Sequence, residues 1–194
     1  MVDTRLDLLR HGQCEGGEMF RGSSDVLLTP EGRAAMEAQI QARRDDRWDG
    51  VVSSPLKRCY HFAEATAARL SLPLIVEPDL REMHFGDWER RRYDELWETH
   101  SQLLKDWGDD PERYTPPGGE PLAVFADRVM TALDRLASQH NGQRLLLITH
   151  GGVIRLLLTR AHQQPRGLLR GHHVPYAHYV SLRWKDGHLS EGNP

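Results

Sequence analysis

The first residues that could carry chemistry are Arg10 and His11, which follow a short apolar run near the N-terminus. An imidazole beside a guanidinium could act as a nucleophile toward a phosphate group that the arginine binds. The same pair occurs in ordinary surface loops, so the three residues Arg10-His11-Gly12 are a weak signal alone. Their meaning depends on which other side chains the fold brings to them.

Two further segments supply groups that suit an anion. Arg58 ends the segment Ser53-Ser54-Pro55-Leu56-Lys57-Arg58, in which Ser54 and Pro55 are typical of a helix start. Its guanidinium could reach back to the preceding strand end and donate two parallel hydrogen bonds to a phosphate. His150, in Thr149-His150-Gly151-Gly152, is predicted at the start of a helix, where the helix dipole favours anions. A solvated helix arginine and a histidine that caps its own helix are the alternatives.

A candidate proton donor, Glu82, lies in the segment Arg81-Glu82-Met83-His84-Phe85-Gly86-Asp87-Trp88-Glu89. A carboxyl group held among apolar side chains can have a raised pKa and act as a general acid at neutral pH. The alternative is that Glu82 stays ionised and pairs with Arg81 or another neighbour. Together with the two segments above, Glu82 completes a set that could transfer a phosphoryl group.

Strand and helix signals alternate along the chain and indicate how these side chains are positioned. Strands are predicted at about 6–10, 51–53, 73–76, 145–148 and 177–184. Helices are predicted from Thr29-Pro30-Glu31 to about Arg44, from Ser54 through Leu70, in one or two pieces through Trp107, over 122–139, and from His150 onward. This alternation predicts a three-layer α/β/α sandwich with a mainly parallel central sheet.

The candidate residues follow predicted strands at the points where those strands end. Arg10-His11, Ser53-Ser54 and Thr149-His150 each occupy such a position. Ligand sites in open α/β sheets lie beyond the carboxyl ends of the strands, so we expect these segments to meet there. We expect one domain over residues 1–194, in which residues 79–120 form an insertion that covers the active site.

Composition limits the class of partner. Hydrophobic residues make up 39% and charged residues 27% of the chain, as in ordinary globular proteins, and the net charge of -3 gives no indication of nucleic-acid binding. No apolar run is long enough to span a membrane, and no secretory signal is recognisable, so we expect a cytoplasmic protein that binds no membrane. The eleven histidines do not show the spacing of a metal site. We therefore expect no metal and no cofactor. A homodimer is left open.

In this order, the motifs resemble those of the histidine phosphatase superfamily, also called phosphoglycerate mutase-like, over nearly the whole chain. The matching segments are Leu-Leu-Arg-His-Gly (8–12), Phe-Arg-Gly (20–22), Leu-Thr-Pro-Glu-Gly (28–32), Ser-Ser-Pro-Leu-Lys-Arg (53–58), residues 81–89, Pro-Pro-Gly-Gly-Glu (116–120) and Thr-His-Gly-Gly (149–152). Within the superfamily the chain is most similar to α-ribazole phosphatases, which dephosphorylate a nucleotide intermediate in assembly of the lower loop of cobalamin. The resemblance implies a phosphoglycerate mutase-like fold.

The resemblance also implies a role for each candidate residue. His11 would be the nucleophile that accepts the phosphoryl group, and Glu82 would donate a proton to the leaving oxygen and then activate water. Arg10, Arg58 and His150 would bind the phosphoryl group. A backbone acceptor for the Nδ1 proton of His11 would direct its Nε2 at phosphorus.

The loop after His11 carries further implied substrate contacts and some departures from the family pattern. The implied contacts are Gln13, Arg21, Gly22 and, at the second histidine, Gly151. Gln13 stands where the family commonly has an acid, and Gly17 stands where the mutases have asparagine. Arg21 is the candidate to replace the contact that Gly17 lacks. We interpret the run from Arg90 to Arg92 as a solvated face.

The function that these residues imply is a phosphomonoesterase with a phosphohistidine intermediate. Its partner would be a small-molecule phosphomonoester, with α-ribazole 5′-phosphate as the specific candidate. The alternatives are a phosphoglycerate mutase-like phosphoryl transferase, which would depend on a bisphosphorylated primer, and a broad-specificity sugar or nucleotide phosphatase. A phosphate-binding protein without turnover is a third, from a different class.

Overall fold

The computed structural model describes residues 3–165 and 171–192 and contains one six-stranded sheet in the order β3-β2-β4-β1-β5-β6. The strands are β1 (Thr4–Arg10), β2 (Gly50–Ser53), β3 (Leu74–Val76), β4 (Arg144–Thr149), β5 (Tyr179–Lys185) and β6 (His188–Glu191). The four strands from β3 to β1 are parallel, whereas β5 and β6 run antiparallel to their neighbours. The expected mainly parallel sheet is therefore confirmed.

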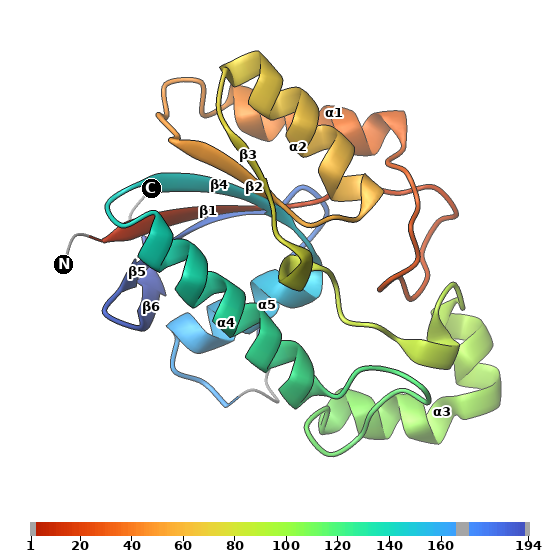
Figure 1. The fold of residues 1–194 in the computed structure, drawn as a ribbon. Helices are drawn as coiled ribbons and strands as arrows, with labels where there is room; N and C mark the ends of the chain where they lie inside the picture. Colours follow the sequence, from red (N-terminus) through yellow and green to blue (C-terminus); the bar gives the residue numbers. More distant parts are fainter. Residues whose placement is uncertain (1–2, 166–170, 193–194) are drawn as a thin grey trace.

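Helices cover both faces of this sheet (Figure 1). On one face, α1 (Pro30–Gln41) and α2 (Lys57–Leu70) pack on side chains such as Leu9 and Ile148. On the other face, α4 (Leu122–Gln139) and α5 (Gly151–Ala161) pack on Leu8 and Leu147. Because β4 is buried on both faces, it reads in sequence as a continuous apolar run. The three-layer sandwich predicted above is the observed fold.

The strand register aligns the candidate segments. Arg10 at the end of β1 is paired with Thr149 at the end of β4, and Ser53 at the end of β2 is paired with Ile148. Since β2, β4 and β1 are neighbours in the sheet, the residues that follow their carboxyl ends must lie together. The sheet thus delivers three separate parts of the sequence to one edge.

The two proline-containing helix starts turn out differently. Thr29 caps α1 as predicted, because its hydroxyl accepts a hydrogen bond from the amide of Gly32 at 3.0 Å. The predicted cap at Ser54 is wrong: α2 begins at Lys57, and Leu56 is its N-cap. The Ser54 hydroxyl is directed to His150 instead, at 2.7 Å from Nε2. The same hydroxyl accepts a longer hydrogen bond from the amide of Leu56, at 3.4 Å, but Leu56 and not Ser54 occupies the N-cap position.

In the segment between β3 and α4, helix α3 (Tyr93–Asp109) lies away from the sheet and is interrupted by a kink at His100 (Figure 1). Two short 3₁₀ turns precede α3. An aromatic cluster joins this segment to the loop after β1, because the ring of Phe20 lies 5.3 Å from those of Phe85 and Trp88. Within residues 3–165 and 171–192, no helix is long and apolar enough to cross a membrane.

Candidate active site

His11 and His150 meet at the carboxyl edge of the sheet. Their ring centroids lie 5.3 Å apart with the rings edge to face, and both side chains are buried. The amide of His11 donates to the carbonyl of Thr149 at 2.9 Å, so the pairing of β1 with β4 continues one residue beyond the strand. Ser54 from the end of β2 contacts His150 through its hydroxyl. The three strand ends therefore converge as the sequence predicted.

The ring of His11 is fixed in one orientation. Its Nδ1 lies 2.8 Å from the carbonyl oxygen of Gly12, which can only accept, so Nδ1 carries the proton and Nε2 carries the lone pair. Gly12 must be glycine here, because a Cβ would collide with the backbone of Gly32. Burial, with added repulsion from Arg58 and Arg10, lowers the pKa of His11 well below its ordinary value. His11 is therefore a neutral imidazole at neutral pH.

His150 is also neutral in the free protein. Burial lowers its pKa well below the ordinary value, and the charge of Arg58 lowers it further. The sequence reasoning placed His150 among groups that bind the phosphoryl group. In the free protein this imidazole offers hydrogen bonding, and the positive charge comes from the guanidinium groups.

Backbone carbonyls hold the two predicted guanidinium groups. Arg10 donates from Nη1 to Val174 at 2.6 Å, and its Cζ lies 4.3 Å from the ring centroid of Tyr176. Arg58, fully buried, donates from Nη1 to Ser24 at 2.8 Å and from Nη2 to Gly22 at 2.7 Å. Val174 and Tyr176, in the loop before β5, thus position Arg10.

Three arginines retain a buried N–H group without a partner in the described part of the chain. These are the Nε groups of Arg10, Arg21 and Arg58. Leaving a buried cationic donor unpaired is costly, and such groups mark places where an anion would bind. Arg21 is itself fixed, because its Nη2 donates to the carbonyls of Glu15 and Gly17 at 2.9 and 2.8 Å.

The remaining predicted contacts differ in their placement. Gln13 is exposed, and its carbonyl accepts a hydrogen bond from the amide of Thr29. Gly22 lies where a Cβ would collide with the backbone of Met83, and its carbonyl holds Arg58. Gly151 opens α5 directly against the guanidinium of Arg10, where a Cβ would lie 3.1 Å from Nε. Gly22 and Gly151 border the buried arginines, whereas the side chain of Gln13 lies at the surface.

The carboxyl group of Glu82 is buried and held by two backbone amides. Oε1 accepts from Met83 at 3.0 Å, and Oε2 accepts from Gly152 at 2.9 Å, in the first turn of α5. The alternative pairing with Arg81 does not occur, because Arg81 contacts Asp79 at 3.5 Å. A Cβ at Gly152 would collide with this carboxyl group, which explains the second glycine after His150.

Arg128 on α4 is a positioning residue that the sequence reasoning missed. Its guanidinium donates to the carbonyls of Asp79 at 2.6 Å, Arg81 at 2.9 Å and Glu82 at 3.1 Å. It also pairs with Glu120 at 2.7 Å while both side chains are about nine-tenths buried. Arg128 therefore fixes the backbone that carries Glu82. A lone arginine in an amphipathic helix gives no sequence signal of this role.

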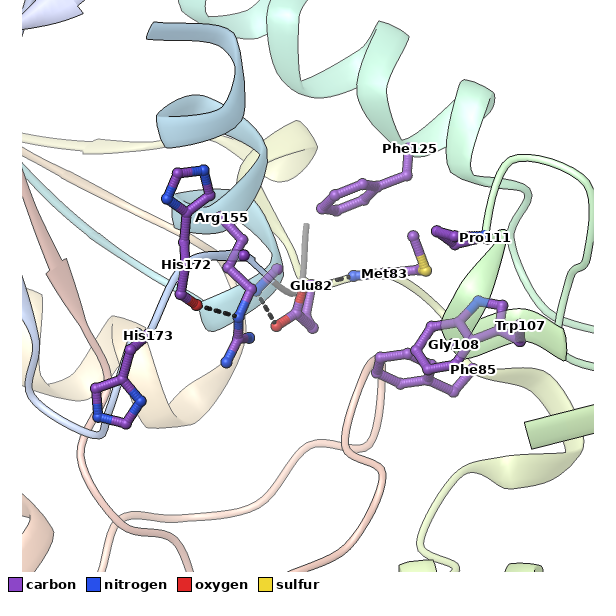
Figure 2. Close-up of a pocket in the computed structure, with 12 residues that line it drawn as sticks. Glu82, Met83, Phe85, Trp107, Gly108, Pro111, Phe125, Arg155, His172 and His173 are labelled. Carbon is purple, nitrogen blue, oxygen red and sulfur yellow. Dashed lines mark hydrogen bonds between the residues drawn. The ribbon is translucent and has the colours of Figure 1, made fainter. Parts of the chain in front are cut away.

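A cavity of about 590 Å³ opens beside Glu82 (Figure 2). It is lined by Glu82, Met83, Phe85, Trp107, Gly108, Pro111, Phe125, Gly152, Arg155, Gly171, His172 and His173. Arg155 was also missed in sequence, although it lies four residues after Gly151 and so on the same face of α5. Volumes of this size are typical of small-molecule sites.

Metal chemistry has no evident ligand set in this part of the molecule. Among residues 3–165 and 171–192, no group of three or more His, Cys, Asp and Glu side chains is arranged to hold a metal ion. What the edge of the sheet does offer is a neutral imidazole with an available lone pair, buried guanidinium groups and a buried carboxyl group. That combination can bind a phosphate group and transfer it.

Comparisons with known proteins agree with this chemistry. The sequence model of the histidine phosphatase superfamily, branch 1, matches residues 6–191. An adenosylcobalamin/alpha-ribazole phosphatase of Salmonella typhimurium is 31% identical over 167 residues, covering 85% of this chain and 83% of the relative.

Solved structures extend the likeness to the fold. The alpha-ribazole phosphatase of Shigella flexneri superposes with a TM-score of 0.85 at 27% identity, covering 97% of this chain and 94% of that one. A mycobacterial glucosyl-3-phosphoglycerate phosphatase gives 0.82 at 26% identity, covering 93% and 90%. These matches support a hydrolase of phosphoric monoesters. The chain belongs to the histidine phosphatase superfamily.

Proposed function

We propose that this protein is a phosphomonoesterase in which His11 becomes transiently phosphorylated. Nε2 of His11 attacks phosphorus, an N–P bond forms, and the P–O bond to the alcohol breaks. The electron pair goes to the leaving oxygen, which takes a proton from Glu82 acting as general acid. Glu82 then takes a proton from a water molecule while the water oxygen attacks phosphorus. The N–P bond breaks, and His11 returns to its neutral form.

One observation carries this proposal: the Nδ1 proton of His11 is bound to the carbonyl of Gly12, near arginines whose buried Nε groups have no partner in the described part of the chain. The hydrogen bond to Gly12 keeps the proton on Nδ1 and so leaves a lone pair on Nε2. The Nε groups of Arg10, Arg58 and Arg21 supply donors for the phosphoryl oxygens. His150 would add a hydrogen bond on the same side. Charge stabilisation and positioning account for most of the catalysis in phosphoryl transfer, so this set suffices without a metal.

The specific substrate that we propose is α-ribazole 5′-phosphate. The Salmonella and Shigella relatives are named as alpha-ribazole phosphatases. The mycobacterial neighbour acts, by its name, on a different phosphate ester, so the shared fold does not select the alcohol. Support for α-ribazole 5′-phosphate therefore comes from the cobalamin relatives and from the apolar cavity beside Glu82.

The test is a rapid-quench experiment with substrate labelled in the phosphate group. Wild-type protein should trap an acid-labile phosphoenzyme, and His11→Ala should trap none while kcat falls by about 10⁴-fold or more. The matched control is His188→Ala, which removes an exposed histidine on β6. A label retained in His11→Ala, or none trapped in the wild type during a single turnover, would refute the phosphohistidine mechanism.

A further inference from the structure

The cavity beside Glu82 shares Glu82 and Gly152 with the candidate site, and its other lining residues have no part in the phosphate chemistry described above. We propose that it binds the leaving alcohol through a flat, apolar ring, and that Phe85, Trp107 and Phe125 select for that ring. This inference rests on the proposed function, since it takes Glu82 as the proton donor. It adds the residues that recognise the leaving alcohol.

The position of Glu82 connects the cavity to the reaction. A general acid must lie within hydrogen-bond reach of the oxygen that it protonates. Glu82 and Gly152 both line the cavity, and Gly152 donates its amide to the Glu82 carboxyl group. An alcohol oxygen that receives a proton from Glu82 therefore carries the rest of its molecule into this space.

The far wall of the cavity is aromatic. The rings of Phe85 and Trp107 lie 6.0 Å apart at 88°, and Phe125 and Met83 complete the apolar surface (Figure 2). Such edge-to-face pairs present ring faces and edges on which another ring can pack. A small, charged alcohol such as a sugar acid would leave this surface in contact with water. A fused-ring heterocycle would cover it.

The opposite part of the cavity is polar. Arg155 reaches it from α5, and its Nε donates to the carbonyl of His172 at 3.2 Å, which holds the guanidinium in place. In Figure 2, Glu82 lies between Arg155 and the Phe85–Trp107 pair. A sugar that carries the phosphate could use hydroxyl groups on Arg155 while its ring substituent extends to the aromatic wall. The cavity therefore fits a nucleoside-like alcohol with an apolar base.

Two substrates that differ only in the base provide the test. Ribose 5-phosphate and α-ribazole 5′-phosphate share the phosphorylated carbon, but only the second has a fused aromatic ring. Wild-type kcat/KM should favour the ring-bearing substrate by about tenfold or more, because stacking on aromatic side chains is worth that much per base. Trp107→Leu should lower this preference about fivefold to one-hundredfold.

The control is Trp97→Leu, which changes a half-exposed tryptophan on the same helix outside the cavity and should leave both rates unchanged. Thermal melting checks that Trp107→Leu and a second variant, Phe85→Leu, are folded. If one of them unfolds, the other provides the test. Equal losses on both substrates, or a wild type without preference, would overturn the inference. Failure of the proposed function looks different, because neither substrate would then be hydrolysed in a His11-dependent way.

Discussion

At the scale of single residues, the important property is the neutral state of His11. A protonated imidazole has no lone pair with which to attack phosphorus. The protein keeps His11 neutral chiefly by burying it, and the charges of Arg58 and Arg10 act in the same direction. The arginines that would bind the phosphate thus also prepare the nucleophile in the free protein.

This arrangement predicts the titration of His11. In phosphate-free protein, NMR of the imidazole should give a pKa well below 6.5, the ordinary value for histidine. Arg58→Met should raise that pKa, because it removes a nearby positive charge that disfavours protonation. Lys57→Met is the matched control, since Lys57 is half-exposed and pairs with Asp25 at 3.6 Å. A wild-type pKa at or above 6.5 would contradict the account of a neutral nucleophile.

At the scale of elements, one carboxylate ties the loop after β1 to the segment before α3. Glu89 accepts hydrogen bonds from the amides of Ser23 at 3.0 Å, Ser24 at 3.1 Å and Phe85 at 3.0 Å, and from the Ser24 hydroxyl. The carbonyl of Ser24 in turn holds Arg58. Glu89 therefore holds the loop residue Ser24, whose carbonyl in turn positions Arg58 in the phosphate site.

Replacing Glu89 should cost stability in a pH-dependent way. Burial alone would raise the pKa of Glu89, but the hydrogen bonds from Ser24, Phe85 and Ser23 outweigh it, so the pKa is lowered below 4.5. A lowered folded-state pKa gives a contribution that is present above the unfolded value and is lost as the pH falls through the folded one. Glu89→Ala should therefore lower the free energy of unfolding by about 1–3 kcal/mol near pH 7.

Urea denaturation near pH 7 and at successively lower pH measures this effect. The difference between wild type and Glu89→Ala should shrink below about pH 4.5, where the unfolded-state carboxyl group begins to bind its proton. Glu98→Ala, at an exposed position of α3, is the control and should change stability little at either pH. A difference that is constant with pH would assign the loss to packing and not to the carboxylate.

The elements also show where sequence reasoning is sufficient and where it is not. Apolar runs and the Thr29 cap are local signals, and they predicted five of the six strands, the mainly parallel sheet and the convergence of His11 with His150; the short strand β6 was not predicted. The Ser54 helix start was wrong: α2 begins at Lys57, and the shorter hydrogen bond of the Ser54 hydroxyl is to a tertiary partner, His150, which local sequence does not reveal. Arg128 was missed for the same reason: the backbone carbonyls that it holds lie 46 to 49 residues earlier, and no local pattern encodes such a contact.

At the scale of the whole molecule, the contacts expected to stabilise the fold and the groups expected to do the chemistry lie at different positions along the strands. Asp7, fully buried in the middle of β1, accepts hydrogen bonds from Trp48 at 2.7 Å and Ser181 at 2.5 Å. It also pairs with Arg144 at 2.6 Å, at the start of β4. These contacts connect β1 to both neighbouring strands and to the segment before β2. They lie in the middle of β1, whereas His11 follows its carboxyl end. Asp7 precedes His11 by four residues, or about 13 Å of extended strand.

Asp7→Ala should therefore destabilise the protein and spare its activity. The expected loss is about 3 kcal/mol, at the low end for a broken buried ion pair, because Arg144 keeps Asp46 at 2.7 Å as a second partner. Asp3→Ala removes a surface carboxylate that pairs with Arg183 at 3.5 Å, and should cost less than about 1 kcal/mol.

Urea denaturation measures the losses in Asp7→Ala and Asp3→Ala. kcat/KM of Asp7→Ala, measured where the protein is folded, should stay within about twofold of wild type, since the groups around His11 are held by their own backbone contacts. A large fall in kcat/KM without unfolding would show that the buried network reaches the nucleophile through β1, and that the two levels of the sheet are coupled.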